Sequence, residues 1–283
     1  MEESKPYTLI TGASRGIGEA MAWECAARKH NLALVALPNE GLGKLSKKIE
    51  QVHGVKVAFL EINLIADNAP EEVLKWTEEF RLHIDVLINN AGFGQLGRFH
   101  EYELGFYRNM IRLNMEVPLA LTHLFLPQLR KAKRGYVLNM GSAAGFFPVP
   151  HKSVYSASKS FLHFTSRAVQ RELRTTNVHL TIVCPNGVPT NDATRARVKQ
   201  LGWKGKLTAV TPEGVAKASL DGMYKGKKVV IPGRFNQFSV ALTRLLGSNY
   251  AMKFMEKQFL KELPAVTTPE PPAEQPREEK AFN

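Results

Sequence analysis

The chain has 283 residues, 44% of them hydrophobic and 23% charged, which suits one large or two small α/β domains with a sizeable core. Two cysteines, Cys25 and Cys184, are too few for a disulfide scaffold and lie in apolar stretches, so we expect reduced thiols and a cytoplasmic location. A formal net charge of +12 favours anionic ligands or an anionic membrane surface, or reflects an ordinary solvated basic surface, but no nucleic-acid-binding motif accompanies it.

Strand-like and helix-like patterns alternate along the chain from residue 7 to residue 232. Continuous apolar runs indicate strands buried on both faces, and apolar residues at three- or four-residue steps indicate amphipathic helices. This alternation predicts an α/β fold with a doubly wound parallel sheet and helices on both faces. In chain order we expect strands at 7–11, 32–37, 56–62, 85–92, 135–142, 178–185 and 228–232, and helices at 19–30, 40–52, 70–81, 103–131, 153–173 and 212–223.

The chain changes character after residue 233. Apolar residues at helical spacing, with basic residues among them, predict an amphipathic helical extension over 234–263, interrupted at 247–249, where Ser248 can cap a second helix. This extension could pack on the core or on a second subunit, or contact a membrane surface through 235–263. Residues 264–283 are rich in proline and glutamate and are predicted to form a disordered tail. No apolar stretch of about 18 residues predicts a spanning helix, and the polar start suggests no secretory signal.

A glycine-rich segment, TGASRGIG, follows the first predicted strand and opens the first helix. It places Gly12, Gly16 and Gly18 where the backbone must turn tightly, let a pyrophosphate approach and aim helix N–H groups at it. The spacing differs from the commoner G-x-G-x-x-G, and a tight turn without a ligand is the alternative. After a buried strand, the segment predicts dinucleotide binding.

The segment YSASK places Tyr155 and Lys159 four residues apart on a predicted helix, so both side chains lie on one face. A neighbouring ammonium favours the ionised phenol and lowers its pKa toward neutrality. The pair therefore predicts a phenol tuned for proton transfer, and an ordinary exposed pair is the alternative.

Taken together, four motifs resemble the short-chain dehydrogenase/reductase family: TGASRGIG, NNAG at 89–92, Ser142 ahead of Tyr155, and the Y-x-x-x-K of Tyr155 and Lys159. The resemblance implies a Rossmann-type catalytic domain over 1–233 with a seven-stranded parallel sheet. It also implies hydride transfer between a nicotinamide dinucleotide and a carbonyl or alcohol. The catalytic residues would be Asn114, Ser142, Tyr155 and Lys159. The cofactor-binding residues would be Gly12, Ser14, Arg15, Gly16, Ile17, Gly18, Asn63, Asn90, Ala91, Gly92, Tyr155, Lys159, Pro185, Val188 and Thr190.

The resemblance also assigns a role to each catalytic residue. Tyr155 would exchange the proton with the substrate oxygen, and Lys159 would tune Tyr155 and hold the cofactor ribose. Ser142 would donate a hydrogen bond to the substrate oxygen. Asn114 would hold a water that connects Lys159 to solvent.

The residues after the second strand bear on the choice of cofactor. Residues 37–39, Leu-Pro-Asn, offer no carboxylate to a ribose, and Glu40 is expected to lie too far along, at the start of the next helix. Arg15 matches the family position where a basic side chain meets a 2′-phosphate, although an exposed loop arginine is the alternative. NADP(H) is therefore favoured over NAD(H), even though Asn63 and Asn186 depart from the family's usual aspartate and glycine.

Apolar residues beside the catalytic motifs suggest a lipophilic substrate, such as a 3-oxoacyl chain, a long-chain ketone or a steroid. The pocket would use Phe93, Phe146, Phe147 and Pro148, with 190–206 as a lid, unless these aromatics only pack the core. We expect a small-molecule carbonyl or alcohol substrate, association of identical subunits, no metal and no nucleic-acid partner. A catalytically silent NADP-binding sensor or scaffold is the alternative function.

Overall fold

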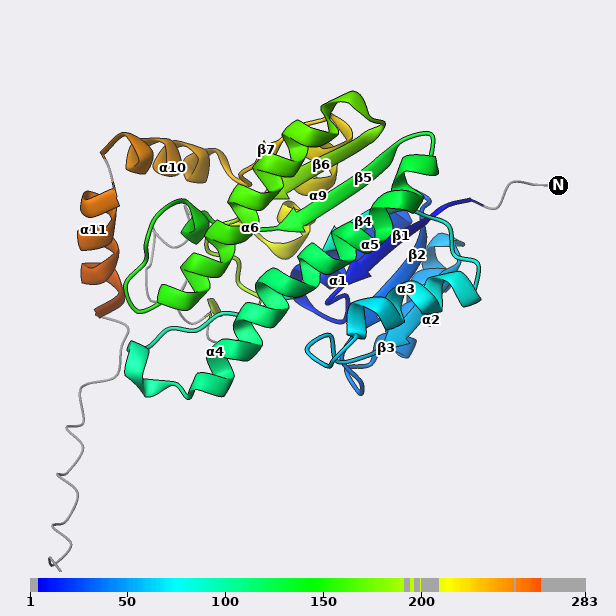
Figure 1. The fold of residues 1–283 in the computed structure, drawn as a ribbon, viewed down its shortest axis with the longest axis horizontal. Coiled ribbons are helices and arrows are strands. Elements are labelled where there is room, and N and C mark those ends of the chain that lie inside the picture. The colour runs from blue at the N-terminus through cyan, green and yellow to red at the C-terminus, as the bar shows by residue number, and fades with distance from the viewer. Residues whose placement is uncertain (1–4, 191–193, 196–198, 200–208, 247, 261–283) are drawn as a thin grey trace, which may run out of the picture.

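Seven parallel strands form one sheet at the centre of the protein, in the order β3-β2-β1-β4-β5-β6-β7 (Figure 1). The computed structural model describes residues 5–190, 194–195, 199, 209–246 and 248–260. The predicted doubly wound, seven-stranded parallel sheet is confirmed. The strands are β1 (Tyr7–Thr11), β2 (Asn31–Ala36), β3 (Val57–Glu61), β4 (Ile84–Asn89), β5 (Gly135–Met140), β6 (Val178–Val183) and β7 (Val229–Val230).

Helices cover both faces of this sheet. The long stretch predicted as one helix over 103–131 is two α-helices joined by a π turn at Arg112–Glu116, which adds one residue to the turn around Asn114. The helices are α1 (Gly16–Ala27), α2 (Leu42–His53), α3 (Ala69–Glu79), α4 (Leu104–Ile111), α5 (Val117–Lys131), α6 (Ser153–Glu172), α9 (Pro212–Tyr224), α10 (Arg234–Leu246) and α11 (Ser248–Leu260).

Alternate residues of each strand enter different cores, as expected for a sheet that is covered on both sides. Ile10 packs in the core that holds Met21 of α1 and Leu220 of α9. Its neighbour Leu9 packs in the core that holds Phe125 of α5 and Trp76 of α3. The continuous apolar runs of the sequence therefore reflect burial on both faces, and all six residues of β2 and of β5 are buried.

The C-terminal extension contains two helices, α10 and α11. The interruption predicted at 247–249 falls where α10 ends at Leu246 and α11 begins at Ser248. The predicted tail, residues 264–283, lies outside the described residues. Among the described residues, no helix is both long and apolar enough to cross a membrane.

The order of the strands reverses at β1, which pairs with β2 on one side and with β4 on the other. In open parallel sheets, a crevice for ligands forms at such a switch point, beyond the carboxyl ends of the strands. Figure 1 shows α4, α10 and α11 at the end of the molecule toward which the strands point.

Candidate active site

The glycine segment links β1 to α1 at the carboxyl edge of the sheet. Gly12 and Gly16 adopt left-handed conformations, with φ of +65° and +62°, which glycine adopts without strain. A Cβ on Gly18 would lie 1.9 Å from the Gly12 carbonyl oxygen, so only glycine allows the helix to approach the turn this closely. No side chain caps the amino end of α1. This cradle fits a pyrophosphate group, which would take up the open N–H groups of the helix.

The NNAG segment holds the glycine turn from the neighbouring strand. The Thr11 hydroxyl accepts hydrogen bonds from the backbone N–H groups of Asn90 and Ala91, both at 3.0 Å. The Asn90 amide donates to the carbonyl oxygens of Thr11 and Gly12, at 3.0 and 3.1 Å. Thr11 is not among the predicted site residues, although its hydroxyl directly before the first glycine could have indicated this role.

Asn114 joins three segments of the site. Its amide nitrogen donates to the Phe93 carbonyl at 2.8 Å and to the Ser158 hydroxyl at 3.0 Å, and its amide oxygen accepts from the Phe93 N–H at 3.1 Å. A Cβ on Gly92 would lie 2.8 Å from the Asn114 amide oxygen and 3.3 Å from Lys159 Nζ. Gly92, Asn114 and Lys159 therefore meet at one point.

Tyr155, Lys159 and Ser142 also come together. The Ser142 hydroxyl forms a hydrogen bond with the phenol of Tyr155, and this bond lowers the pKa of the phenol. Lys159 Nζ lies 5.9 Å from the centroid of the Tyr155 ring and donates to the Met140 carbonyl at 2.9 Å. A Cβ on Gly94 would lie 2.7 Å from the ring, so the loop after β4 lies directly on the phenol.

The electrostatics of this pair differ from the sequence expectation. Burial raises the pKa of Tyr155 above its usual value and outweighs the opposing hydrogen bond from Ser142. Burial also lowers the pKa of Lys159 to about 8. The expected lowering of the Tyr155 pKa by Lys159 is therefore wrong for the protein's own groups, because the low-polarity surroundings disfavour both charged forms.

Glu40 corrects a second expectation. The helix after β2 begins at Leu42, so Glu40 lies in the turn before it rather than inside it. Its carboxylate accepts a hydrogen bond from the Ser14 hydroxyl and forms an ion pair with Arg15 at 3.3 Å. A carboxylate therefore contacts the glycine loop on the side where the adenosine ribose would lie.

The strand ends beyond β3 and β6 supply the remaining predicted cofactor residues. Asn63 is exposed and accepts a hydrogen bond from the Ile65 N–H at 3.1 Å. Pro185 accepts a hydrogen bond from the Ala143 N–H at 2.9 Å, next to Ser142. A Cβ on Gly16 would lie 3.2 Å from the Thr190 side chain.

Two apolar residues of the predicted cofactor-binding set, Ile17 and Val188, pack against the core that contains α1. The turn after β6 places its left-handed residue at Gly187, with φ of +57°, and not at Asn186. The substitution of asparagine for the family's glycine therefore needs no unusual backbone conformation.

The predicted substrate pocket divides between two places. Phe93 packs edge-on against Phe106, with ring centroids 5.3 Å apart, in the loop that covers Tyr155. Phe146 instead packs against His163, with centroids 4.8 Å apart. Phe147 is half-buried and Pro148 is exposed.

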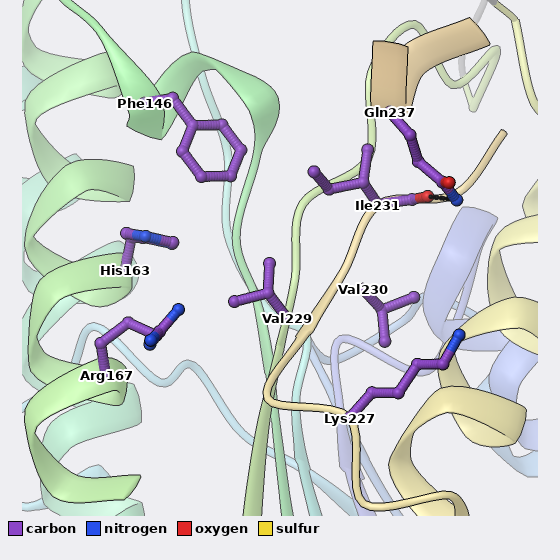
Figure 2. A pocket seen from close by; sticks show the side chains of 8 residues that line it. All are labelled: Phe146, His163, Arg167, Lys227, Val229, Val230, Ile231 and Gln237. Carbon is purple, nitrogen blue, oxygen red and sulfur yellow. Dashed lines mark hydrogen bonds between the residues drawn. The ribbon is translucent and has the colours of Figure 1, made fainter. Parts of the chain in front are cut away.

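Figure 2 shows that Phe146 lines a separate hollow between α6 and the strand β7. The described contacts of Phe146 thus belong to this hollow and not to the phenol, because the short helical turn after Ser142 directs it there. Most of the predicted lid, 190–206, lies outside the described residues. The hollow has a volume of about 340 Å³ and is lined by Phe146, His163, Arg167, Lys227, Val229, Val230, Ile231 and Gln237.

Comparisons with known proteins identify similar chains. The sequence profile described as "short chain dehydrogenase" matches residues 6–201. The chain is 30% identical to the ketoacyl reductase HetN of a Nostoc species, over 84% of this chain and 82% of that protein. It is 31% identical to the very-long-chain 3-oxoacyl-CoA reductase-B of Danio rerio, over 76% of this chain and 67% of that protein. A short-chain dehydrogenase from Sphingobium yanoikuyae in complex with NADPH is 27% identical, with a TM-score of 0.73 over 94% of this chain and 99% of that one.

Proposed function

The chain belongs to the short-chain dehydrogenase family and is a nicotinamide-dependent oxidoreductase. We propose that it uses NADP(H) to interconvert a carbonyl and a secondary alcohol on a lipophilic substrate. The observation that carries the proposal is the hydrogen-bonded pair of Ser142 and Tyr155 with buried Lys159 one helical turn away. This group lies at the carboxyl edge of the sheet, with Lys159 beside Gly92 of the loop that holds the glycine turn.

Tyr155 is the proposed proton donor in reduction. A bound nicotinamide supplies the hydride to the carbonyl carbon, or accepts it in the reverse reaction. Burial keeps the Tyr155 phenol protonated, so it can give its proton to the substrate oxygen as charge develops there. Ser142 donates a second hydrogen bond to the same oxygen and stabilises that charge.

Lys159 and Asn114 support this proton transfer. Lys159 holds the cofactor ribose and, as a cation close to the phenol, favours the phenolate that remains after the transfer. Asn114 fixes the loop at Phe93 to helix α6 through Ser158, which keeps the phenol and the ammonium in place. The water that connects Lys159 to solvent remains part of this proposal.

The preference for NADP(H) is supported by Arg15 and by the lack of a carboxylate at residues 37–39, where β2 ends. Arg15 is 79% exposed and contacts Glu40, so a 2′-phosphate would compete with Glu40 for the guanidinium. A doubly charged phosphate forms stronger charge-assisted hydrogen bonds to arginine than a single carboxylate does. The Sphingobium relative, which binds NADPH, is consistent with this preference.

Fluorescence titration tests the cofactor choice. NADPH should bind at least about tenfold more tightly than NADH. Arg15→Ala should weaken NADPH binding and leave NADH binding unchanged, whereas Glu40→Gln should strengthen NADPH binding by releasing Arg15. Equal affinities for the two cofactors in the wild-type protein would refute the preference.

The lipophilic substrate is supported by the names of two relatives, a ketoacyl reductase and a very-long-chain 3-oxoacyl-CoA reductase. An NADPH-consumption assay should compare 3-oxoacyl thioesters, long-chain ketones and steroid ketones with short ketones of the same chemistry. We expect kcat/KM to rise with the apolar length of the substrate. Tight NADPH binding without turnover of any carbonyl would instead indicate a sensor or scaffold protein.

A further inference from the structure

Helix α10 turns its large apolar side chains away from the body of the protein. The side chains that face the body are Asn236 and Val240, which are 1% and 4% exposed. The Asn236 amide donates to the Pro232 carbonyl at 3.0 Å, so a polar contact fixes this inner face. The opposite face carries Phe235, Phe238, Leu242 and Leu245, which are 41%, 65%, 42% and 83% exposed.

These four residues, here called the outer stripe, follow steps of three, four and three residues along the helix. Such spacing places them on one side of α10, opposite Asn236 and Val240. A surface helix of a soluble protein normally buries this side, and a contiguous exposed apolar surface marks an interaction site. Helix α11 contacts α10 and still leaves the outer stripe exposed.

The charge around the outer stripe selects the kind of partner. Arg234 is exposed at the start of α10, and Lys253 and Lys257 are exposed on α11. A second copy that docked symmetrically on this face would bring these same cations together. An anionic lipid surface offers opposite charge and an apolar layer that can take up phenylalanine and leucine side chains.

We infer that the outer stripe of α10 docks the protein onto an anionic phospholipid bilayer. Helices α10 and α11 lie at the end of the molecule toward which the strands point, the end that also holds the candidate active site (Figure 1). Docking through this face would bring the site close to a store of lipophilic molecules. The docking itself goes beyond the proposed function, because it does not depend on which reaction is catalysed.

Vesicle flotation of the full chain tests the inference. The protein should float with vesicles of phosphatidylcholine that contain about one third phosphatidylglycerol, and binding should fall in pure phosphatidylcholine or at high salt. The double substitution Phe238→Ser with Leu245→Ser should lower the vesicle partition coefficient at least about tenfold. Phe80→Ser is the matched control, because Phe80 is 64% exposed directly after α3, and it should leave binding unchanged.

Sedimentation velocity of the same proteins without lipid tests the alternative that a second copy of the chain covers the outer stripe. If the wild-type chain ignores anionic vesicles and the double variant alone loses an oligomeric state, the outer stripe is a subunit interface and the inference is overturned. If neither property changes, the stripe binds neither partner and the inference is equally overturned. NADPH binding in every variant reports an intact fold, so failure at the bilayer leaves the proposed function standing.

Discussion

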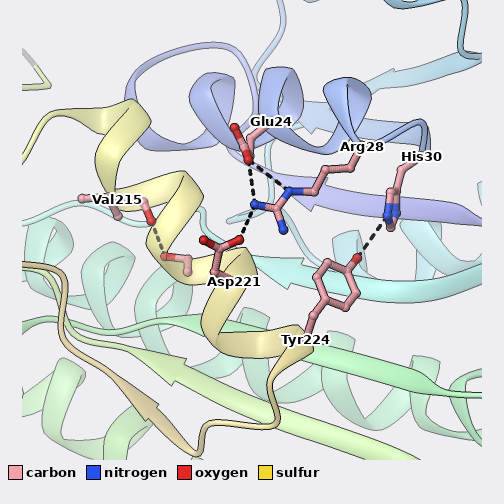
Figure 3. Close-up of polar contacts among 7 residues, drawn as sticks. Glu24, Arg28, His30, Val215, Asp221 and Tyr224 are labelled. Carbon is pink, nitrogen blue, oxygen red and sulfur yellow. Dashed lines mark hydrogen bonds and ion pairs between the residues drawn. The ribbon is translucent and has the colours of Figure 1, made fainter.

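The two edges of the sheet hold similar polar side chains in opposite arrangements. At the amino edge, Arg28 of α1 donates to Glu24 at 2.7 Å and to Asp221 of α9 at 2.6 Å (Figure 3). Beside it, the ring of His30 contacts the Tyr224 hydroxyl at 3.2 Å and the Thr8 hydroxyl at 3.0 Å. Each of these groups therefore finds a partner within the chain.

At the carboxyl edge, the buried cation has a hydrogen bond to the Met140 carbonyl but no such ion pair. Lys159 is 5% exposed, and within the described part of the chain no carboxylate lies in salt-bridge distance of it. The amino end of α1 has no side-chain cap. A buried cation and an open helix end reduce stability unless a ligand completes them, so this edge is built for binding and the other for stability.

One half-buried tyrosine lies at each edge of the sheet, and the two should respond differently to loss of the hydroxyl. Tyr155→Phe should reduce kcat at least about a hundredfold and leave NADPH affinity unchanged within about twofold, because only the proton donor is lost. Tyr224→Phe should leave kcat unchanged and lower the free energy of unfolding by about 1 kcal/mol, since it removes one hydrogen bond to His30. Steady-state kinetics and urea unfolding measure the two effects. Substantial turnover by the Tyr155 variant would show that another group donates the proton.

A methyl group at Gly18 tests how tightly the glycine turn is packed. The new Cβ would lie 1.9 Å from a backbone oxygen, so Gly18→Ala should lower the free energy of unfolding by about 2–3 kcal/mol and weaken NADPH binding. Gly105→Ala is the matched control, because a Cβ there meets nothing within 4 Å in helix α4. The control should be neutral or slightly stabilising. Equal stability of the two variants would contradict the close approach.

Removing the central cation of the amino edge should affect stability without affecting catalysis. Arg28→Met leaves the Glu24 and Asp221 carboxylates without their shared partner, and we expect the free energy of unfolding to fall by about 1–2 kcal/mol. The value is modest because Arg28 and both carboxylates remain partly exposed. Thermal unfolding measures the loss, and kcat and KM should stay at wild-type values. A changed kcat would show that the two edges are coupled.

Asp85 is an exception at the amino edge and predicts a pH dependence. Its Oδ1 atom is buried, and among the described residues it finds no hydrogen-bond donor. Burial raises the pKa of this carboxyl from 3.8 to about 6, so the folded state favours the protonated form. This contribution to stability is complete below pH 3.8 and is lost as the pH rises through about 6.

The substitution Asp85→Asn should therefore make the protein more stable than the wild type at pH 8, by about 1–2 kcal/mol, and no more stable at pH 4. Urea unfolding at the two pH values measures the difference. A stability gain that does not depend on pH would mean that the carboxyl is not the titrating group.

Local pattern in the sequence predicted most of the fold. Every expected strand is present, because strands covered on both faces require continuous apolar runs. Some observed elements differ from the predicted ones in their bounds or their regularity. The last strand, predicted over 228–232, spans only Val229–Val230. The helix predicted over 103–131 is interrupted by a π turn around Asn114.

The site was predicted less completely than the fold. The motifs identified Ser142, Tyr155 and Lys159, and the structure brings them together. Thr11 was not predicted, and Glu40 was expected to lie too far along, at the start of the next helix, since both roles depend on which loops meet at the carboxyl edge. The same limit applies to α10, where the spacing predicted an amphipathic helix but not which face is exposed.

Neighbours within a few residues fix the succession of strands and helices, the glycine turn and the catalytic motifs, so these features could be predicted from the sequence. The folded structure was needed for the direction of the Tyr155 pKa, the contact of Glu40 with the glycine loop and the outward stripe of α10. Each of these depends on which segments, distant in the chain, cover a side chain or leave it exposed. The degree to which a side chain is removed from water depends on the folded structure around it and cannot be read from the neighbouring residues in the sequence.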